Sequence, residues 1–170
     1  MNKQSQGHVS GKEKLQACTT LQEILEQATD FERTARDFYA ALAPKVSKRI
    51  RFLVDELVIE EQAHYDLFLD LAKDPDVIHQ IHIKINVPSS NKRFSDCIQL
   101  PELGENPDDQ TILQYALGRE QAAMDQYHAL AESTPEGPLK DVFVFLAQEE
   151  TEHKNELEKI YYEVVHSGGV

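Results

Sequence analysis

The chain has 170 residues, 41% hydrophobic and 28% charged, and its formal net charge of −13 excludes a nucleic-acid surface, which requires clustered Lys and Arg. Its two cysteines, Cys18 and Cys97, lie far apart in sequence, so neither a disulfide framework nor a thiolate metal site is expected. The sequence contains no apolar run of membrane-spanning length and no secretory signal, so we expect a cytoplasmic protein without membrane contact. We predict a flexible arm at residues 1–19, one domain at 20–166 and a tail at 167–170.

The first helix is predicted at residues 20–43. Thr20-Leu21-Gln22-Glu23 has the pattern of a capping box, which opens a helix. Apolar residues then recur at helical spacing, and Glu32 lies seven residues from Leu25, on the same face. This glutamate requires an explanation, because burying an unpaired carboxylate is costly in free energy.

The second helix is predicted at residues 45–73, and it carries a Glu-x-x-His motif on its apolar face. Glu61 lies seven residues after Val54, and His64 lies seven residues after Leu57. Because an α-helix has about 3.6 residues per turn, side chains three apart project from nearly the same face. Glu61 and His64 can therefore bind one metal ion.

The pattern changes between residues 74 and 107. Residues 81–87 alternate apolar and polar side chains, as a short strand or extended segment does. A structureless loop of this length would be unusual in a compact domain. We therefore predict an ordered crossover that connects two helical hairpins.

The second hairpin repeats the chemistry of the first. A third helix, predicted at 109–133 and opened by the aspartate before it, carries Glu120 on its apolar face. The expected inward residues of this helix are Leu113, Ala116, Leu117, Ala123, Met124, Tyr127 and Leu130. A fourth helix, predicted at 138–166, carries Glu150 and His153 as a second Glu-x-x-His motif. The fold class predicted is all-α, a four-helix bundle made of two hairpins.

An internal repeat relates the two halves of the chain. Residues 32–42 match residues 120–130, with Glu, Ala, Asp, Tyr, Ala and Leu recurring in register. The Glu-x-x-His motif follows the lone glutamate after 29 residues in the first half and after 30 in the second. Six inward side chains are thus predicted to converge: Glu32, Glu61, His64, Glu120, Glu150 and His153.

The charges of this set favour metal binding. Four carboxylates gathered in an apolar core would repel one another or would have to bind protons. Two divalent cations cancel four carboxylates when both histidines are neutral. Oxygen ligands with one imidazole per metal suit iron or manganese, whereas structural zinc usually recruits thiolates or more imidazoles. We expect a dinuclear site, with manganese or zinc as substitutes for iron.

The ligand pattern resembles that of the ferritin-like di-iron carboxylate proteins, notably rubrerythrins and bacterioferritins. The resemblance covers the four helical segments and implies that Glu32 and Glu120 are terminal ligands, that Glu61 and Glu150 bridge two irons, and that each histidine binds one. Rubrerythrins place another glutamate one turn after the third-helix ligand, where this chain has Ala123. They also usually carry a four-cysteine rubredoxin module, which two cysteines cannot build. The chain is most similar to a stand-alone rubrerythrin-like domain.

Four further residues are predicted to support the ligands. Glu60 and Glu149 directly precede the two Glu-x-x-His motifs and could orient a ligand histidine through its outer nitrogen. Tyr39 and Tyr127, each seven residues after a lone glutamate, could hydrogen-bond ligand carboxylates or shield the core from oxidants, although plain core packing is their commoner role. Two histidines of the crossover, His79 and His82, are expected to be surface residues. The other three carry no signal: His8, His128 and His166.

The resemblance implies a di-iron oxidoreductase that reduces hydrogen peroxide or oxidises Fe(II) with dioxygen or peroxide. No catalytic residue beyond the metal ligands is expected. The electrons would come from a separate donor protein, because the chain has no visible redox module of its own. One alternative is an iron-binding, storage or delivery protein without turnover, and another is an oxygen-dependent hydroxylase with an apolar pocket beside the metals. A homodimer is expected.

Overall fold

The computed structural model describes residues 20–83, 85 and 106–167, and this part of the chain is helical, with no strand. The arm, the last three residues and most of the predicted crossover lie outside it, as do both cysteines and His8. No helix in the described part is both long and apolar enough to cross a membrane. The helices are α2 (Leu21–Leu42), α3 (Lys48–Leu71), α4 (Pro75–Gln80), α6 (Asp109–Ser133) and α7 (Pro138–Ser167).

The start of α2 confirms the predicted capping box. The Thr20 side chain accepts a hydrogen bond from the Glu23 backbone N–H, and the Glu23 carboxylate accepts one from the Thr20 backbone N–H. Such a cap satisfies N–H groups that have no partner within the helix. The start of α6 is capped as predicted too, since the Asp108 side chain accepts from the Thr111 N–H at 2.7 Å.

The crossover differs from the prediction in its described part. It begins with the short helix α4, which was not predicted and which Asp74 caps at its N-terminus. Residues 81–83 form a turn rather than a strand, and the rest of the predicted 81–87 segment lies largely outside the described residues. The carbonyls of Ile81 and Ile83 accept hydrogen bonds from the first two N–H groups of α2, both at 3.0 Å. The segment thus satisfies a helix terminus instead of pairing as a strand.

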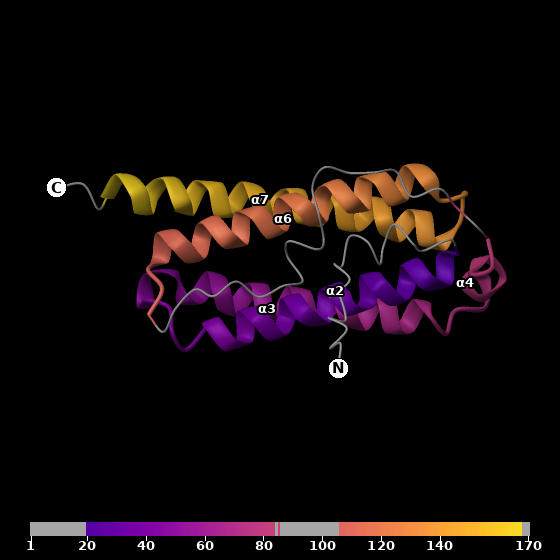
Figure 1. Cartoon of the computed structure of the whole chain (residues 1–170), viewed down its shortest axis with the longest axis horizontal. Helices are drawn as coiled ribbons and strands as arrows, with labels where there is room; N and C mark the ends of the chain where they lie inside the picture. Colours follow the sequence, from indigo (N-terminus) through magenta and orange to yellow (C-terminus); the bar gives the residue numbers. More distant parts are fainter. Residues whose placement is uncertain (1–19, 84, 86–105, 168–170) are drawn as a thin grey trace, which may run out of the picture.

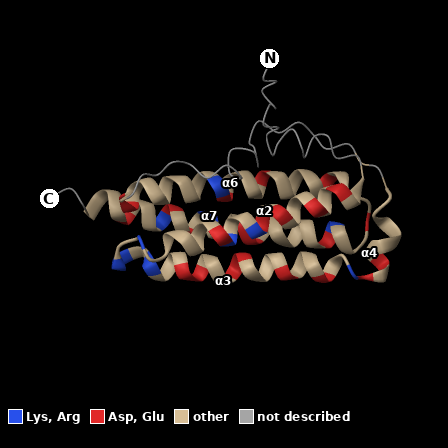
Figure 2. Ribbon diagram, turned by 60° about the horizontal axis from the view of Figure 1, so that its bottom comes forward, with Lys and Arg blue, Asp and Glu red and all other residues tan. Residues whose placement is uncertain are grey.

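The four long helices lie side by side as two hairpins, α2 with α3 and α6 with α7 (Figure 1). Side-chain contacts place α2 next to α6 and α3 next to α7. In the first pair Tyr39 contacts Glu120, and in the second Glu60 contacts His153. Carboxylates are spread along the long helices, as expected from the net charge (Figure 2).

The apolar core divides into two clusters. One cluster holds the N-terminal part of α2, the C-terminal part of α3 and the facing parts of α6 and α7, and it includes Phe31, Phe68 and Phe143. The other gathers the opposite ends of the helices, among them Ile50 and Leu157. On every long helix the candidate metal ligands lie between the residues of the two clusters. A buried polar layer is therefore enclosed by apolar layers on both sides.

Helix α6 is buried over a wider surface than its predicted stripe. Leu113, Ala116, Ala123, Tyr127 and Leu130 are buried as predicted, but Leu117 and Met124 are only half-buried. The additional buried residues are Ile112, Arg119, Ala122, Gln126 and Ala131. The reason is that α6 packs against both α7 and α2, so two adjoining faces lose contact with water.

Candidate metal centre

All six predicted residues lie inside the protein between the two hairpins. Their relative exposures run from 0% for Glu32 to 6% for His153. Carboxylates are almost never buried to this extent without a partner. They come from all four long helices, so the packing of the helices fixes their positions.

The ligand atoms form two groups, in each of which all atoms lie within 4.8 Å of one another. Glu61 and Glu150 belong to both groups. The first group is completed by Glu32 and His64, and the second by Glu120 and His153. Each group is a set of carboxylate oxygens with one imidazole, and either group could hold a metal ion.

The spacing within each group suits a shared cation. His64 Nδ1 lies 3.4 to 3.6 Å from carboxylate oxygens of Glu150, Glu32 and Glu61. His153 Nδ1 lies 3.5 Å from Glu150 and 3.7 Å from Glu120. Two ligands held about 2.1 Å from one ion at tetrahedral or octahedral angles are about 3.0 to 3.4 Å apart. The observed separations are slightly longer, so a small inward movement of the side chains would suffice.

Several buried atoms of the site have no hydrogen-bond partner. They are Glu32 Oε2, Glu61 Oε2, both carboxylate oxygens of Glu150, and the Nδ1 atoms of His64 and His153. Buried polar atoms are normally hydrogen-bonded, because leaving one unsatisfied costs about 1–3 kcal/mol. These atoms face the shared centre, where a cation would satisfy them together. These carboxylate oxygens and imidazole nitrogens therefore fit a metal ion as ligand atoms.

The two tyrosines bind the glutamates of the opposite hairpin. Tyr39 on α2 donates to Glu120 Oε1 at 2.8 Å, and Tyr127 on α6 donates to Glu32 Oε1. Both rings are completely buried. The predicted hydrogen bonds to ligand carboxylates are present, and each leaves the second oxygen of its glutamate facing the centre.

Glu60 and Glu149 differ in their contacts although they occupy equivalent positions in the repeat. The Nε2 atom of His153 donates to Glu60 at 2.7 Å, while Nδ1 of the same ring points to the centre. In the part of the chain that the structure describes, no hydrogen bond or ion pair connects Glu149 to His64. The orienting contact predicted for both glutamates is seen for one.

Arg119 is a buried neighbour of the site that the sequence reading missed. Its guanidinium donates to the Phe31 carbonyl at 3.0 Å and stacks on the Phe31 ring, 4.3 Å from the ring centroid. Arg119 directly precedes Glu120, as Phe31 directly precedes Glu32. The internal repeat contained a signal for this contact. Arg119 and Phe31 hold the same position relative to Glu120 and Glu32, so they are expected to meet where α2 and α6 pack together.

Burial and mutual repulsion raise the pKa of two carboxyl groups. Burial and the charges of Glu150 and Glu32 raise the pKa of Glu61 well above its usual range. Burial and the neighbouring Glu120 raise the pKa of Glu150 to about 8. Burial acts on Glu120 in the same direction, but the close side chains of Glu150 and His153 outweigh it and lower the pKa of Glu120 to about 2.

The histidines balance the remaining carboxylates. Burial disfavours the charged form of His64, yet the close carboxylates of Glu150 and Glu32 raise the pKa of His64 far above its usual range. The pKa of His153 is raised likewise, because Glu120 and Glu150 outweigh burial. Burial also opposes ionisation of Glu32, but His64 outweighs it and the pKa of Glu32 is lowered. Without metal, these shifts favour imidazolium ions beside Glu32 and Glu120 and favour the protonated forms of Glu61 and Glu150.

Replacing Tyr39 by phenylalanine should destabilise the metal-free protein. The change removes the hydroxyl that donates to the buried Oε1 atom of Glu120, which costs about 1–3 kcal/mol. Urea denaturation in the presence of a chelator measures this. Tyr162→Phe is the matched control, since Tyr162 is 64% exposed and its hydroxyl faces water, and it should change stability by less than about 0.5 kcal/mol. Equal stability of Tyr39→Phe and the parent would contradict the role assigned to this hydrogen bond.

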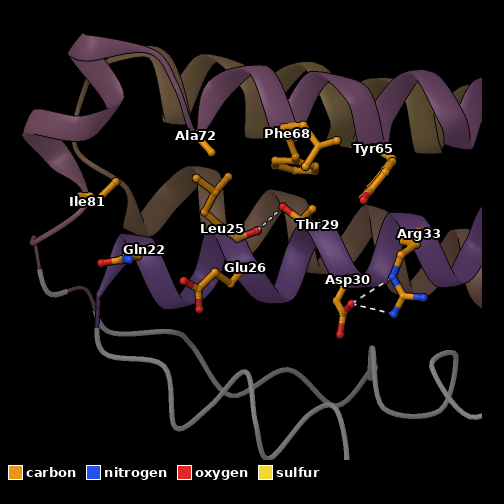
Figure 3. A pocket seen from close by; sticks show the side chains of 11 residues that line it. Gln22, Leu25, Glu26, Thr29, Asp30, Arg33, Tyr65, Phe68, Ala72 and Ile81 are labelled. Atoms are coloured by element: carbon orange, nitrogen blue, oxygen red, sulfur yellow. Dashed lines mark hydrogen bonds and ion pairs between the residues drawn. The ribbon is translucent and has the colours of Figure 1, made fainter.

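A surface groove of about 320 Å³ lies between α2 and α3 on the outside of the first hairpin (Figure 3). Leu25, Tyr65 and Phe68 line it together with the ion pair of Arg33 and Asp30. None of the six candidate ligands lines this groove. Of the other described histidines, His79 and His82 are exposed as predicted, and His128 and His166 are also exposed.

Comparisons with protein-family models, with curated proteins and with solved structures find no significant match to this chain. The class of the protein therefore follows from the molecule itself. Its described residues form an all-helical structure whose core encloses a layer of carboxylates and histidines that could hold a metal ion.

Proposed function

We propose that the chain is a ferritin-like four-helix bundle with a dinuclear iron site, and that it acts as an oxidoreductase of rubrerythrin-like type. The observation that carries the proposal is the sharing of Glu61 and Glu150 by two ligand groups, each completed by its own glutamate and histidine. Sharing of two carboxylates is what a pair of bridged metal ions requires. A single ion would leave Glu32 and His64, or Glu120 and His153, buried without a function.

The residues have distinct roles in this proposal. Glu61 and Glu150 would bridge the two ions, Glu32 and His64 would complete one coordination sphere, and Glu120 and His153 the other. If two ferrous ions were bound there, they would supply the two electrons that, with two protons, convert hydrogen peroxide to two water molecules. The tyrosine hydroxyls hold the terminal glutamates in place. The apolar clusters on both sides keep bulk water out.

The same residues could instead oxidise Fe(II) with dioxygen or peroxide. In both reactions the chain supplies ligands and a dry environment, while the electrons come from outside. A peroxidase needs a separate electron-donor protein to restore the ferrous state, whereas a ferroxidase takes its electrons from the Fe(II) that it oxidises. We place peroxide reduction first and expect the protein to work as a homodimer.

Iron binding, storage or delivery without turnover is the second candidate, because the buried ligand set favours it equally. A storage cage requires many subunits, so a monomer or dimer in light scattering would exclude that version. A hydroxylase would need an apolar pocket beside the ligands. The groove between α2 and α3 has no candidate ligand in its lining, so nothing in it favours this third reading.

Metal content after anaerobic loading tests the proposal. The metal-free protein is loaded with Fe(II), desalted and analysed for iron per chain, with Glu61→Ala and Glu150→Ala alongside. Loss of a shared ligand should remove both ions, so we expect about two irons in the parent and fewer than about half an iron in each variant. The loaded parent should then consume peroxide in the presence of a chemical reductant. A parent that retains no iron, manganese or zinc would overturn the proposal.

A further inference from the structure

The two halves of the candidate metal centre are not equivalent. In the internal repeat, the candidate ligands of the two halves correspond: Glu32 to Glu120, and His64 to His153. The tyrosine contacts also match, since each terminal glutamate receives one hydroxyl from the other hairpin. The difference lies in the outer nitrogen of the histidines.

His153 is held on both sides. Its Nδ1 atom faces Glu120 and Glu150 in the centre, and its Nε2 atom donates to Glu60 of the neighbouring helix at 2.7 Å. The Glu60 side chain is 44% exposed, so its carboxylate keeps contact with water while it accepts from His153. The repeat would put Glu149 in the same relation to His64. Among the described residues, however, His64 has no such carboxylate on its outer nitrogen.

This asymmetry should change how strongly each half binds a metal ion. A carboxylate on the outer N–H of an imidazole fixes the tautomer in which the inner nitrogen carries a lone pair. It also holds the ring in its binding orientation and makes the inner nitrogen a stronger donor. Removing such a partner commonly weakens metal binding about 10- to 100-fold. His64 would have to acquire its orientation when the ion binds.

We infer that Glu60 is a positioning residue that acts through His153, and that it makes the Glu120–His153 half of the centre bind metal differently from the Glu32–His64 half. The inference rests on the proposed dinuclear site and adds an order to it: two binding steps of unequal affinity, only one of which depends on Glu60. Arg119 beside Glu120 is unchanged in every comparison below, so its charge does not affect the differences.

The experiment compares Glu60→Ala with its repeat counterpart Glu149→Ala. The metal-free full-length proteins are titrated with Mn(II) by calorimetry and with Co(II) by visible absorption, which reports the ligand field directly. We expect Glu60→Ala to weaken one binding step about 10- to 100-fold, and Glu149→Ala to change both steps less than about twofold. Glu60→Gln, which keeps an acceptor oxygen but removes the charge, should lie between the parent and Glu60→Ala.

Two further backgrounds locate the effect. With His64→Ala, which disables the other half, Glu60→Ala should still weaken the remaining step by a similar factor. With His153→Ala, replacing Glu60 should have less than about a twofold effect, because its partner is gone. A merely structural role of Glu60 would produce the same loss in both backgrounds, and that result would overturn the inference.

The outcomes separate this inference from the proposed function. A parent that binds two ions, with Glu60→Ala and Glu149→Ala equally affected or equally unaffected, overturns the inference and leaves the proposed dinuclear site standing. A parent that binds no metal overturns both. Two binding steps with a loss confined to Glu60→Ala support both.

Discussion

Replacing Glu61 by leucine should raise the free energy of unfolding of the metal-free protein by about 2 kcal/mol, although the same change should abolish metal loading. Glu61 is 2% exposed and lies among three other buried carboxyl groups. Its Oε2 atom has no hydrogen-bond partner. Exchanging a buried ionisable group for an apolar one of similar volume is often neutral or stabilising by about 1–4 kcal/mol. A ligand retained at a cost to stability is expected of a binding site.

Urea denaturation of the metal-free proteins measures this effect, and thermal melting should show it as a rise of about 4–8 °C. Glu56→Leu, at an exposed position on the same helix, controls for a general gain from added apolar surface and should change stability by less than about 0.5 kcal/mol. If Glu61→Leu is destabilised by more than 1 kcal/mol instead, Glu61 contributes to the fold and the metal assignment loses its physical basis.

The long helices and the inward positions of the six candidate residues could be predicted because both are properties of local periodicity. The predicted ranges 20–43, 45–73, 109–133 and 138–166 agree with α2, α3, α6 and α7 to within three residues at each end. A carboxylate on an apolar helical face is visible in sequence, since the face follows from spacing alone. Repetition of the same spacing in both halves then indicated that the faces meet.

Contacts between helices could not be predicted in the same way. Glu60 and Glu149 look equivalent in sequence, and only the rotation and offset of α3 against α7 decide that Glu60 reaches His153. The burial of Arg119 likewise depends on α6 packing against two helices.

Helix α4 had a local signal in the sequence, an aspartate cap followed by Pro75, but the alternation of apolar and polar residues after it favoured an extended segment. In the structure, the carbonyls of Ile81 and Ile83 in this segment accept hydrogen bonds from the first N–H groups of α2.

The charges of the site can be balanced in two ways, and this links its stability to its function. Without metal, the raised pKa values of His64 and His153 favour imidazolium ions beside Glu32 and Glu120, and those of Glu61 and Glu150 favour protonated carboxyl groups. With two divalent ions bound, all four carboxylates would be ionised and both imidazoles would be neutral. Both arrangements carry no net charge, which a buried layer between two apolar clusters requires. Metal binding then amounts to an exchange of protons for cations.

Binding of two divalent ions near pH 7 should therefore release about four protons, one from each of His64, His153, Glu61 and Glu150. Titration calorimetry with Mn(II) in buffers of different ionisation enthalpy counts them. Nitrogen-15 NMR of the histidine side chains gives an independent test. In the metal-free protein both ring nitrogens of His64 and His153 should carry protons at pH 7, with the exposed His128 and His166 as internal controls. Release of one proton or none would show that the metal-free site keeps its carboxylates ionised and its imidazoles neutral.

The same exchange fixes how stability depends on pH. The pKa values of His64, His153, Glu61 and Glu150 are all raised in the folded protein, the last to about 8, so above pH 6 the folded state holds more protons than the unfolded chain. Stability of the metal-free protein must then fall as pH rises, by about 1.4 kcal/mol per pH unit for each excess proton. The lowered pKa values of Glu32 and Glu120, the latter about 2, act only in acid, where their contribution to stability is lost as pH falls.

Thermal melts between pH 6 and 8 should show that the metal-free protein loses at least about 2 kcal/mol of stability, while added Mn(II) stabilises it increasingly. A metal-free protein that becomes more stable over this range would contradict the proton inventory, because its folded state would then bind fewer protons than the unfolded chain.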